Sequence, residues 1–76
     1  MDRDLFRKRL AEVLQQSSEQ FESNGAVLPE DMESIVVIDI MALVDEMFGV
    51  TLSPDAIQRA KTADEILELV VSTPDS

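Results

Sequence analysis

The chain contains no cysteine, histidine, tryptophan or tyrosine among its 76 residues. Without cysteine it can form neither a disulfide nor a thiolate zinc site, and it has no catalytic thiol. Without histidine it lacks the side chain that most often serves as a general base or as a transition-metal ligand. The nucleophile–base pairs of covalent catalysis therefore cannot be assembled in the usual ways, so we expect neither an enzyme nor a metal site.

Basic side chains are scarce and unevenly placed. Sixteen acidic residues against six basic ones give a formal charge of −10. No cation lies in residues 10–58, whereas carboxylates occur throughout that stretch. Such a surface repels nucleic acid and anionic lipid and attracts partners with basic patches, and it would also keep a small protein soluble.

Long hydrophobic runs are absent as well. Apolar runs such as residues 40–44 are far shorter than the roughly 20 residues that cross a bilayer, so we expect no membrane insertion. Residues 1–20 are charged and periodic, unlike a signal peptide, which leads us to expect a cytoplasmic protein. With 76 residues, 45% of them hydrophobic, we expect one domain over residues 1–76 with a thin core.

Helical periodicity begins near the first residues. With Asp2 or Asp4 as a cap, apolar residues recur at spacings of three and four and predict a helix that ends near residue 17 or 18. Residues 18–31 hold the turn signal Asn24-Gly25 and then a proline, and they are interpreted as a long loop.

Three further helices are indicated by their starts and stops. Residues 34–48 are the most apolar segment and predict a helix that ends at Gly49. A Ser-Pro pair opens a short helix over residues 54–60, and Thr62 forms a capping box with Glu65 before the last helix. A frayed tail covers about residues 72–76. The predicted fold is all-α: a small bundle of three main helices plus a short fourth, with a long loop between helices 1 and 2.

The head of the second predicted helix carries the most specific pattern. It reads Glu33-Ser34-Ile35, and residues 43–50 read LVDEMFGV, followed closely by Pro54-Asp55. This pattern resembles that of the acyl carrier proteins, whose hallmark is Asp-Ser-Leu at this point and an acidic-Phe-Gly-Ile stretch at the helix end. The resemblance covers nearly the whole chain. It implies a covalent 4′-phosphopantetheine arm, derived from coenzyme A, attached to Ser34.

The chemistry of this serine agrees with the resemblance. A serine in the first turn of a helix projects its hydroxyl toward solvent, and the unpaired amides and positive dipole of that end suit a phosphodiester. The arm would carry a thiol that the chain itself lacks. The implied function is to hold acyl intermediates as thioesters in fatty acid, polyketide or related biosynthesis. Residues 30–32 depart from the family's Leu-Gly, which favours a specialised carrier over a housekeeping one.

The resemblance also implies partners and the surface that meets them. The partners are a phosphopantetheinyl transferase and acyl-transferring, ligase or synthase enzymes with basic docking patches, acting on a monomeric carrier. The implied partner-facing positions lie at the start of the second helix and along it: Glu33, Ile35, Ile38, Asp39, Ala42, Asp45 and Glu46. Val36 is added to them because of the apolar residues that follow Ser34, as described below. The implied core residues are apolar: Phe6, Leu10, Val13, Ile40, Met41, Val44, Phe48, Leu52, Ile66 and Val70.

The apolar residues after Ser34 suggest a docking strip. Four consecutive residues, 35–38, span about 300° of a helix, so at least one should face solvent although all four are apolar. We expect Val36 to be that residue and to form the strip together with Ile38.

Two other functions remain open. An acidic helical adaptor would dock partners through its second helix without any prosthetic group. An EF-hand loop beginning at Gln20 would place Glu22 third, Gly25 sixth and Asp31 twelfth. Calcium loops of this type require a glycine at the sixth position, which Gly25 would supply. Against it, Gln20 replaces the usual first aspartate and Pro29 occupies the tenth position.

Overall fold

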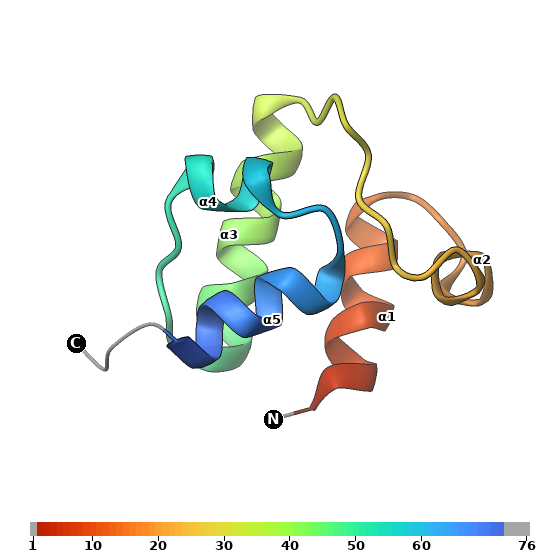
Figure 1. The fold of residues 1–76 in the computed structure, drawn as a ribbon, viewed down its shortest axis with the longest axis horizontal. Coiled ribbons are helices and arrows are strands. Elements are labelled where there is room, and N and C mark those ends of the chain that lie inside the picture. Colours follow the sequence, from red (N-terminus) through yellow and green to blue (C-terminus); the bar gives the residue numbers. More distant parts are fainter. Residues whose placement is uncertain (1, 73–76) are drawn as a thin grey trace.

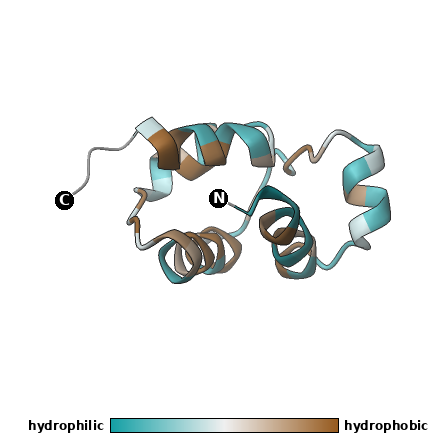
Figure 2. Cartoon of the chain, turned by 90° about the horizontal axis from the view of Figure 1, so that it is seen from below, coloured by the Kyte–Doolittle hydropathy of each residue, from teal (hydrophilic) through white to brown (hydrophobic). Residues whose placement is uncertain are grey.

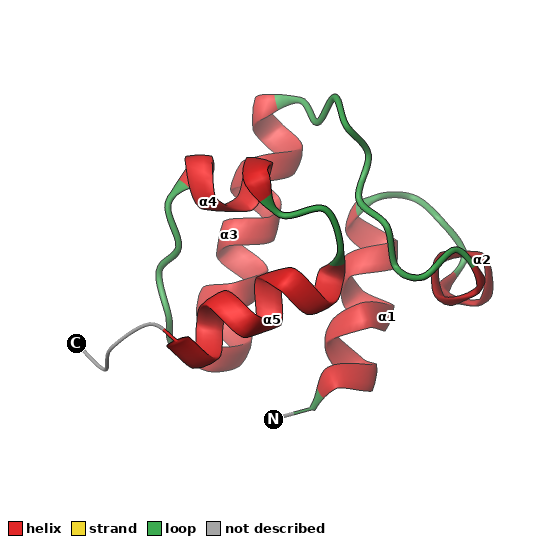
Figure 3. Cartoon of the chain, in the orientation of Figure 1, coloured by secondary structure: helices red, strands yellow, loops and turns green. Residues whose placement is uncertain are grey.

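The computed structural model describes residues 2–72 of the 76-residue chain. Within that range the backbone forms five helices and no strand (Figure 3). The helices are α1 (Arg3–Val13), α2 (Ser18–Ser23), α3 (Ser34–Phe48), α4 (Pro54–Arg59) and α5 (Ala63–Ser72). The predicted all-α class is confirmed. No helix of the described residues is long and apolar enough to span a bilayer.

α1 and α3 run side by side in opposite directions, and α5 crosses both of them on one side (Figures 1 and 2). α4 lies beside α3, and α2 lies beyond α1 (Figure 1). On the side of α1 and α3 that faces away from α5, no other helix of residues 2–72 covers them (Figure 2). One long face of α3 is therefore left open.

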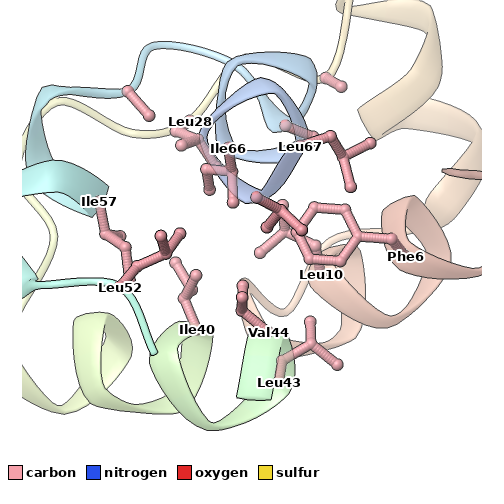
Figure 4. Close-up of a cluster of buried hydrophobic side chains, with 14 of the residues drawn as sticks. Phe6, Leu10, Leu28, Ile40, Leu43, Val44, Leu52, Ile57, Ile66 and Leu67 are labelled. Atoms are coloured by element: carbon pink, nitrogen blue, oxygen red, sulfur yellow. The ribbon is translucent and has the colours of Figure 1, made fainter. Parts of the chain in front are cut away.

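The core is entirely apolar, because every buried side chain in residues 2–72 belongs to a hydrophobic residue. Figure 4 shows Ile40 of α3 beside Leu52 and below Ile66 of α5, whereas Phe6 of α1 lies beside Leu10 on the other side of the cluster. The rings of Phe6 and Phe48 join α1 to the end of α3, with their centroids 5.6 Å apart. Tilted aromatic pairs at this distance are favourable beyond the area that they bury.

Most of the expected core is confirmed. Buried as expected are Phe6, Leu10, Ile40, Val44, Leu52, Ile66 and Val70. Val13, Met41 and Phe48 are only partly buried against the core, because they lie at its edge. Phe21 and Leu28 were not expected in the core, yet both are buried, and both come from the segment that was interpreted as a loop.

The first helix is shorter than predicted. α1 ends at Val13, because Gln15 adopts a left-handed φ of 59° and turns the chain back on the helix. The amide of Gln16 then donates a hydrogen bond of 2.9 Å to the carbonyl of Ala11, which is the closing bond of a Schellman turn. Nothing in residues 14–16 signals this turn, since the usual glycine is missing.

Part of the predicted long loop is helical. The described residues therefore contain two short helices, α2 and α4, where only one was predicted. Ser17 starts α2, its hydroxyl accepting a hydrogen bond of 3.1 Å from the amide of Gln20. The side chain of Phe21 is fully buried and anchors α2 to the core. A six-residue helix gains its stability from such packing and not from propensity alone.

The last helix is longer than predicted. α5 continues through Ser72, the residue at which the frayed tail was expected to begin. The remainder of that predicted tail, residues 73–76, lies outside the described residues. At the other end, the capping box is confirmed: the Thr62 hydroxyl accepts from the amide of Glu65, and the Glu65 carboxylate accepts from the amide of Thr62, both at 3.2 Å.

Arg7 links three helices through its guanidinium group. It donates a hydrogen bond of 2.8 Å to Asp64 of α5 and lies 3.6 Å from Glu22 of α2 and 3.5 Å from Asp4 of α1. The hydrogen bond to Asp64 is the main reason that the pKa of Arg7 is raised above its ordinary value. These ion pairs hold α2 and α5 against α1.

Candidate functional site

The segment that leads into α3 is tied to the linker between α4 and α5. Two backbone hydrogen bonds of 2.8 and 2.9 Å join residues 26–28 to residues 61–63, on either side of an antiparallel bridge between Val27 and Thr62. Because the side chain of Leu28 is also buried, this segment is fixed to the core a few residues before α3 begins. The start of α3 therefore has a defined position.

The other four helices of the described chain have side-chain caps. In each, the residue before the helix accepts a hydrogen bond from an amide of the first turn through its side chain, which satisfies one of the unpaired donors at that end. The capping residues are Asp2 for α1, Ser17 for α2, Ser53 for α4 and Thr62 for α5.

α3 begins without such a cap. Its N-cap residue is Glu33, in extended backbone conformation, and the carboxylate of Glu33 accepts no capping hydrogen bond. Only the carbonyl of Glu33 is used, accepting from the amides of Val36 at 3.0 Å and Val37 at 3.1 Å. This end of α3 therefore keeps the partial positive charge and the free donors that favour an anion.

Ser34 is the first residue of α3 and is exposed to solvent. Five helices begin within residues 2–72, and only the start of α3 has no side-chain cap. The hydroxyl of Ser34 lies at this uncapped start. An external enzyme can reach such a hydroxyl, and a phosphodiester formed on it would lie against the open end of the helix. The expected position of Ser34 at the first turn is confirmed.

Most of the predicted partner-facing positions are exposed and form one surface. Seven of the eight are exposed on α3 or at its N-cap: Glu33, Ile35, Ile38, Asp39, Ala42, Asp45 and Glu46. The six that belong to the helix lie on the side of α3 that faces away from the buried Val37, Ile40 and Val44, whereas Glu33 lies at the N-cap in line with that buried face. The eighth position is Val36, which is half-buried and packs against the core.

The expectation that Val36 faces solvent is wrong. The residue seven positions later, Leu43, is buried, and residues seven apart differ by only about 20° around a helix. Val36 therefore points toward the same side as Leu43. The exposed apolar residues after Ser34 are instead Ile35 and Ile38, which are 63% and 59% exposed.

Ile35, Ile38 and Ala42 follow one another at spacings of three and four, so they form a continuous line along the open face of α3. We call these three residues the apolar strip. Figure 2 shows that α3 is brown, and so hydrophobic, over most of its circumference, whereas α2 is mainly teal. An apolar surface on both sides of a helix is more than packing against one core requires.

Carboxylates flank the apolar strip, and one of them is paired. Glu46 lies 3.4 Å from the guanidinium of Arg9 on α1, with the two side chains 70% and 43% exposed. Asp45 is also exposed, yet no cation of residues 2–72 lies within ion-pair distance of it. The pairing of Arg9 with Glu46 has no signal in the sequence, because nothing local connects residues that are 37 positions apart.

The EF-hand interpretation conflicts with the backbone. Residues 20–23, which would be the first four of the calcium loop, belong to α2. Within residues 2–72 no three or more carboxylates are grouped so that they could hold a metal ion. Residues 20–31 therefore lack the backbone of an EF-hand loop.

A family model described as a phosphopantetheine attachment site matches residues 4–70, which is most of the chain. Comparisons with curated proteins and with solved structures gave no match.

Proposed function

This chain belongs to the phosphopantetheine attachment site family, and on that premise we propose that Ser34 is the residue to which its prosthetic group is attached. Members of this family are carriers that bear 4′-phosphopantetheine covalently. When bound, the group supplies a thiol at the end of a flexible arm, which a chain without cysteine cannot supply itself.

The observation that carries the assignment is the uncapped start of α3 beneath an exposed serine. In the attachment step the Ser34 oxygen would bond to the phosphorus that carries pantetheine, and the pyrophosphate bond of coenzyme A would break. Adenosine 3′,5′-bisphosphate would leave, and the hydroxyl proton would pass to a base of the transferase. The new phosphodiester is an anion, and the first-turn amides of α3 are the donors that stabilise one. The segment that leads to this serine is joined to the linker before α5 by two backbone hydrogen bonds.

We further propose that the loaded carrier holds acyl intermediates as thioesters for fatty acid, polyketide or related biosynthesis. The chain binds and presents the acyl group, and its partners perform the chemistry. The departure in residues 30–32 from the Leu-Gly of the family supports a specialised carrier. The same proposal takes the carrier to be a monomer that acts in the cytoplasm.

The open face of α3 is the surface that we assign to partners. It begins at Ser34, so an enzyme that binds there reaches the prosthetic group at the same time. Its apolar strip gives up water on binding, and Asp39 and Asp45 beside the strip attract a basic patch.

Incubation with coenzyme A, magnesium and a broad-specificity phosphopantetheinyl transferase tests the attachment site. Intact-mass spectrometry should show the gain of one phosphopantetheinyl group by the wild type and none by Ser34→Ala. Ser18→Ala is the matched control, because Ser18 is likewise the first residue of a helix, and this variant should be modified normally. Modification of another serine, or of none, would falsify the assignment, and the second result would favour the adaptor.

A further inference from the structure

Two adjacent carboxylates on α3 differ in their surroundings. Asp45 and Glu46 are both exposed, and they point about 100° apart around the helix. Glu46 points toward α1, where Arg9 lies 3.4 Å from it, whereas Asp45 has no cation of the described chain beside it. Asp45 therefore offers a basic partner an available charge, whereas the charge of Glu46 is already compensated by Arg9.

The pair of Arg9 and Glu46 is too exposed to add much to stability. Ion pairs between exposed side chains typically contribute little to folding. The ion pair matters more for binding than for stability, because Arg9 both neutralises Glu46 and repels a cation of an approaching partner. At the short distances of an interface, within a screening length of about 8 Å, salt removes only part of this repulsion.

We propose that Arg9 is a specificity-determining residue of this carrier, because it cancels the charge of Glu46 and so selects partners that present no cation to the corner between α1 and α3. This inference rests on the proposed docking of partners on α3. The electrostatic attraction then falls to Asp39 and Asp45, and the docking surface extends from α3 onto α1.

Apo carrier and a phosphopantetheinyl transferase with a basic docking face provide the test. At low salt, Arg9→Gln should lower the KM for the carrier by about two- to fivefold with little change in kcat, because the repulsion is lost and Glu46 becomes available. Arg59→Gln is the control: it removes the same charge from α4, away from the corner, and should lower KM clearly less.

A double-mutant cycle separates the local pair from the net charge. Glu46→Gln alone should change KM by less than about twofold, but in the Arg9→Gln background it should reverse most of the gain. Equal effects of Arg9→Gln and Arg59→Gln, or a KM that rises in Arg9→Gln, would overturn the role of Arg9.

Failure of the inference is distinguishable from failure of the proposed function. If the wild type gains no phosphopantetheinyl group at Ser34, the proposed function is wrong. If Ser34 is modified normally and the cycle shows no coupling between Arg9 and Glu46, the proposed function stands and the inference is wrong. The melting temperature of Arg9→Gln should remain close to that of the wild type, which excludes a merely structural role.

Discussion

α3 and α5 contribute to the same core, yet they are built differently. α5 buries one apolar face, closes its start with the capping box of Thr62 and Glu65, and is tied to α1 through Asp64. α3 buries an equivalent face but also exposes Ile35 and Ile38, and no side chain closes its start. Apart from the exposed Val71, stability alone accounts for the features of α5. The additional features of α3 add little to stability, and the proposed docking of partners gives them a function.

The largest expected difference lies between the buried face of α5 and the exposed face of α3. Ile66 is fully buried, so Ile66→Ala should lower the free energy of unfolding by about 2–5 kcal/mol. Ile38→Ala should lower it by less than about 0.5 kcal/mol, because Ile38 is mostly exposed. Urea unfolding followed by circular dichroism measures both.

A small domain can unfold altogether after a loss of that size. Ile66→Val, which should cost about 0.5–1.5 kcal/mol, then provides the measurable value. A comparable loss in Ile38→Ala would mean that Ile38 belongs to the core, and the comparison between the two helices would break down.

The next largest difference in stability is expected between changes at the start of α5 and changes at the start of α3. Thr62→Ala removes the hydroxyl that caps α5 and should cost about 0.5–2 kcal/mol. Ser34→Ala at α3 removes no capping bond and should change the free energy of unfolding by a few tenths of a kcal/mol at most. Thermal unfolding of the two apo variants at equal salt gives this difference. A clear loss in Ser34→Ala would show that Ser34 supports the fold.

The ion pairs of Arg7 that anchor α5 should contribute somewhat less to the free energy of unfolding than the cap of α5 does. Arg7→Met removes the hydrogen bond to Asp64 and the pairs with Asp4 and Glu22, and we expect a loss of about 1 kcal/mol that shrinks as salt rises. The raised pKa of Arg7 fixes the pH dependence. A group with a raised folded-state pKa stabilises fully below its unfolded pKa and loses that contribution only as the pH rises through the folded value.

For an arginine that range lies above the pH at which proteins are normally studied. The difference between the wild type and Arg7→Met should therefore stay constant between about pH 7 and pH 10. Unfolding curves across this range provide the measurement, and a difference that declines before about pH 10 would contradict the assignment of the effect to Arg7.

The smallest effect on stability should accompany a clear effect on docking. Ile38→Asp on α3 and Val71→Asp on α5 each place a carboxylate at an exposed apolar position, 59% and 65% exposed respectively. Each should change the free energy of unfolding by less than about 0.5 kcal/mol. Only Ile38→Asp should raise the KM of the transferase, by about tenfold, because only this position lies on the open face of α3. Equal KM values would remove the apolar strip from the docking surface.

Features that depend on neighbours in sequence were predicted well. Gly49 ends α3 with a left-handed φ of 68°, and Thr62 and Glu65 form the expected capping box. Both follow from local backbone chemistry, in which a glycine tolerates that φ and a Thr-x-x-Glu pattern satisfies its own amides.

Features that depend on tertiary packing were not predicted. α2 exists because Phe21 is buried, and nothing in the polar segment around it announces that burial. Periodicity showed that one of residues 35–38 had to face solvent, but which one depends on where α1 and α4 pack against α3, and so Val36 was chosen wrongly. The pairing of Arg9 with Glu46 likewise could not be predicted from the sequence, because it joins two helices.

The bridge between Val27 and Thr62 makes the middle of the chain a closed loop that contains all of α3 and α4. Opening of this loop must break the two hydrogen bonds beside the bridge together. The amides of Leu28 and Ala63, which donate the two hydrogen bonds beside the bridge, should exchange with deuterium at closely matched protection even though they lie far apart in sequence. If Ser34 is the attachment site as proposed, a chain closed in this way presents it to its partners on a segment that is tied to the linker before α5.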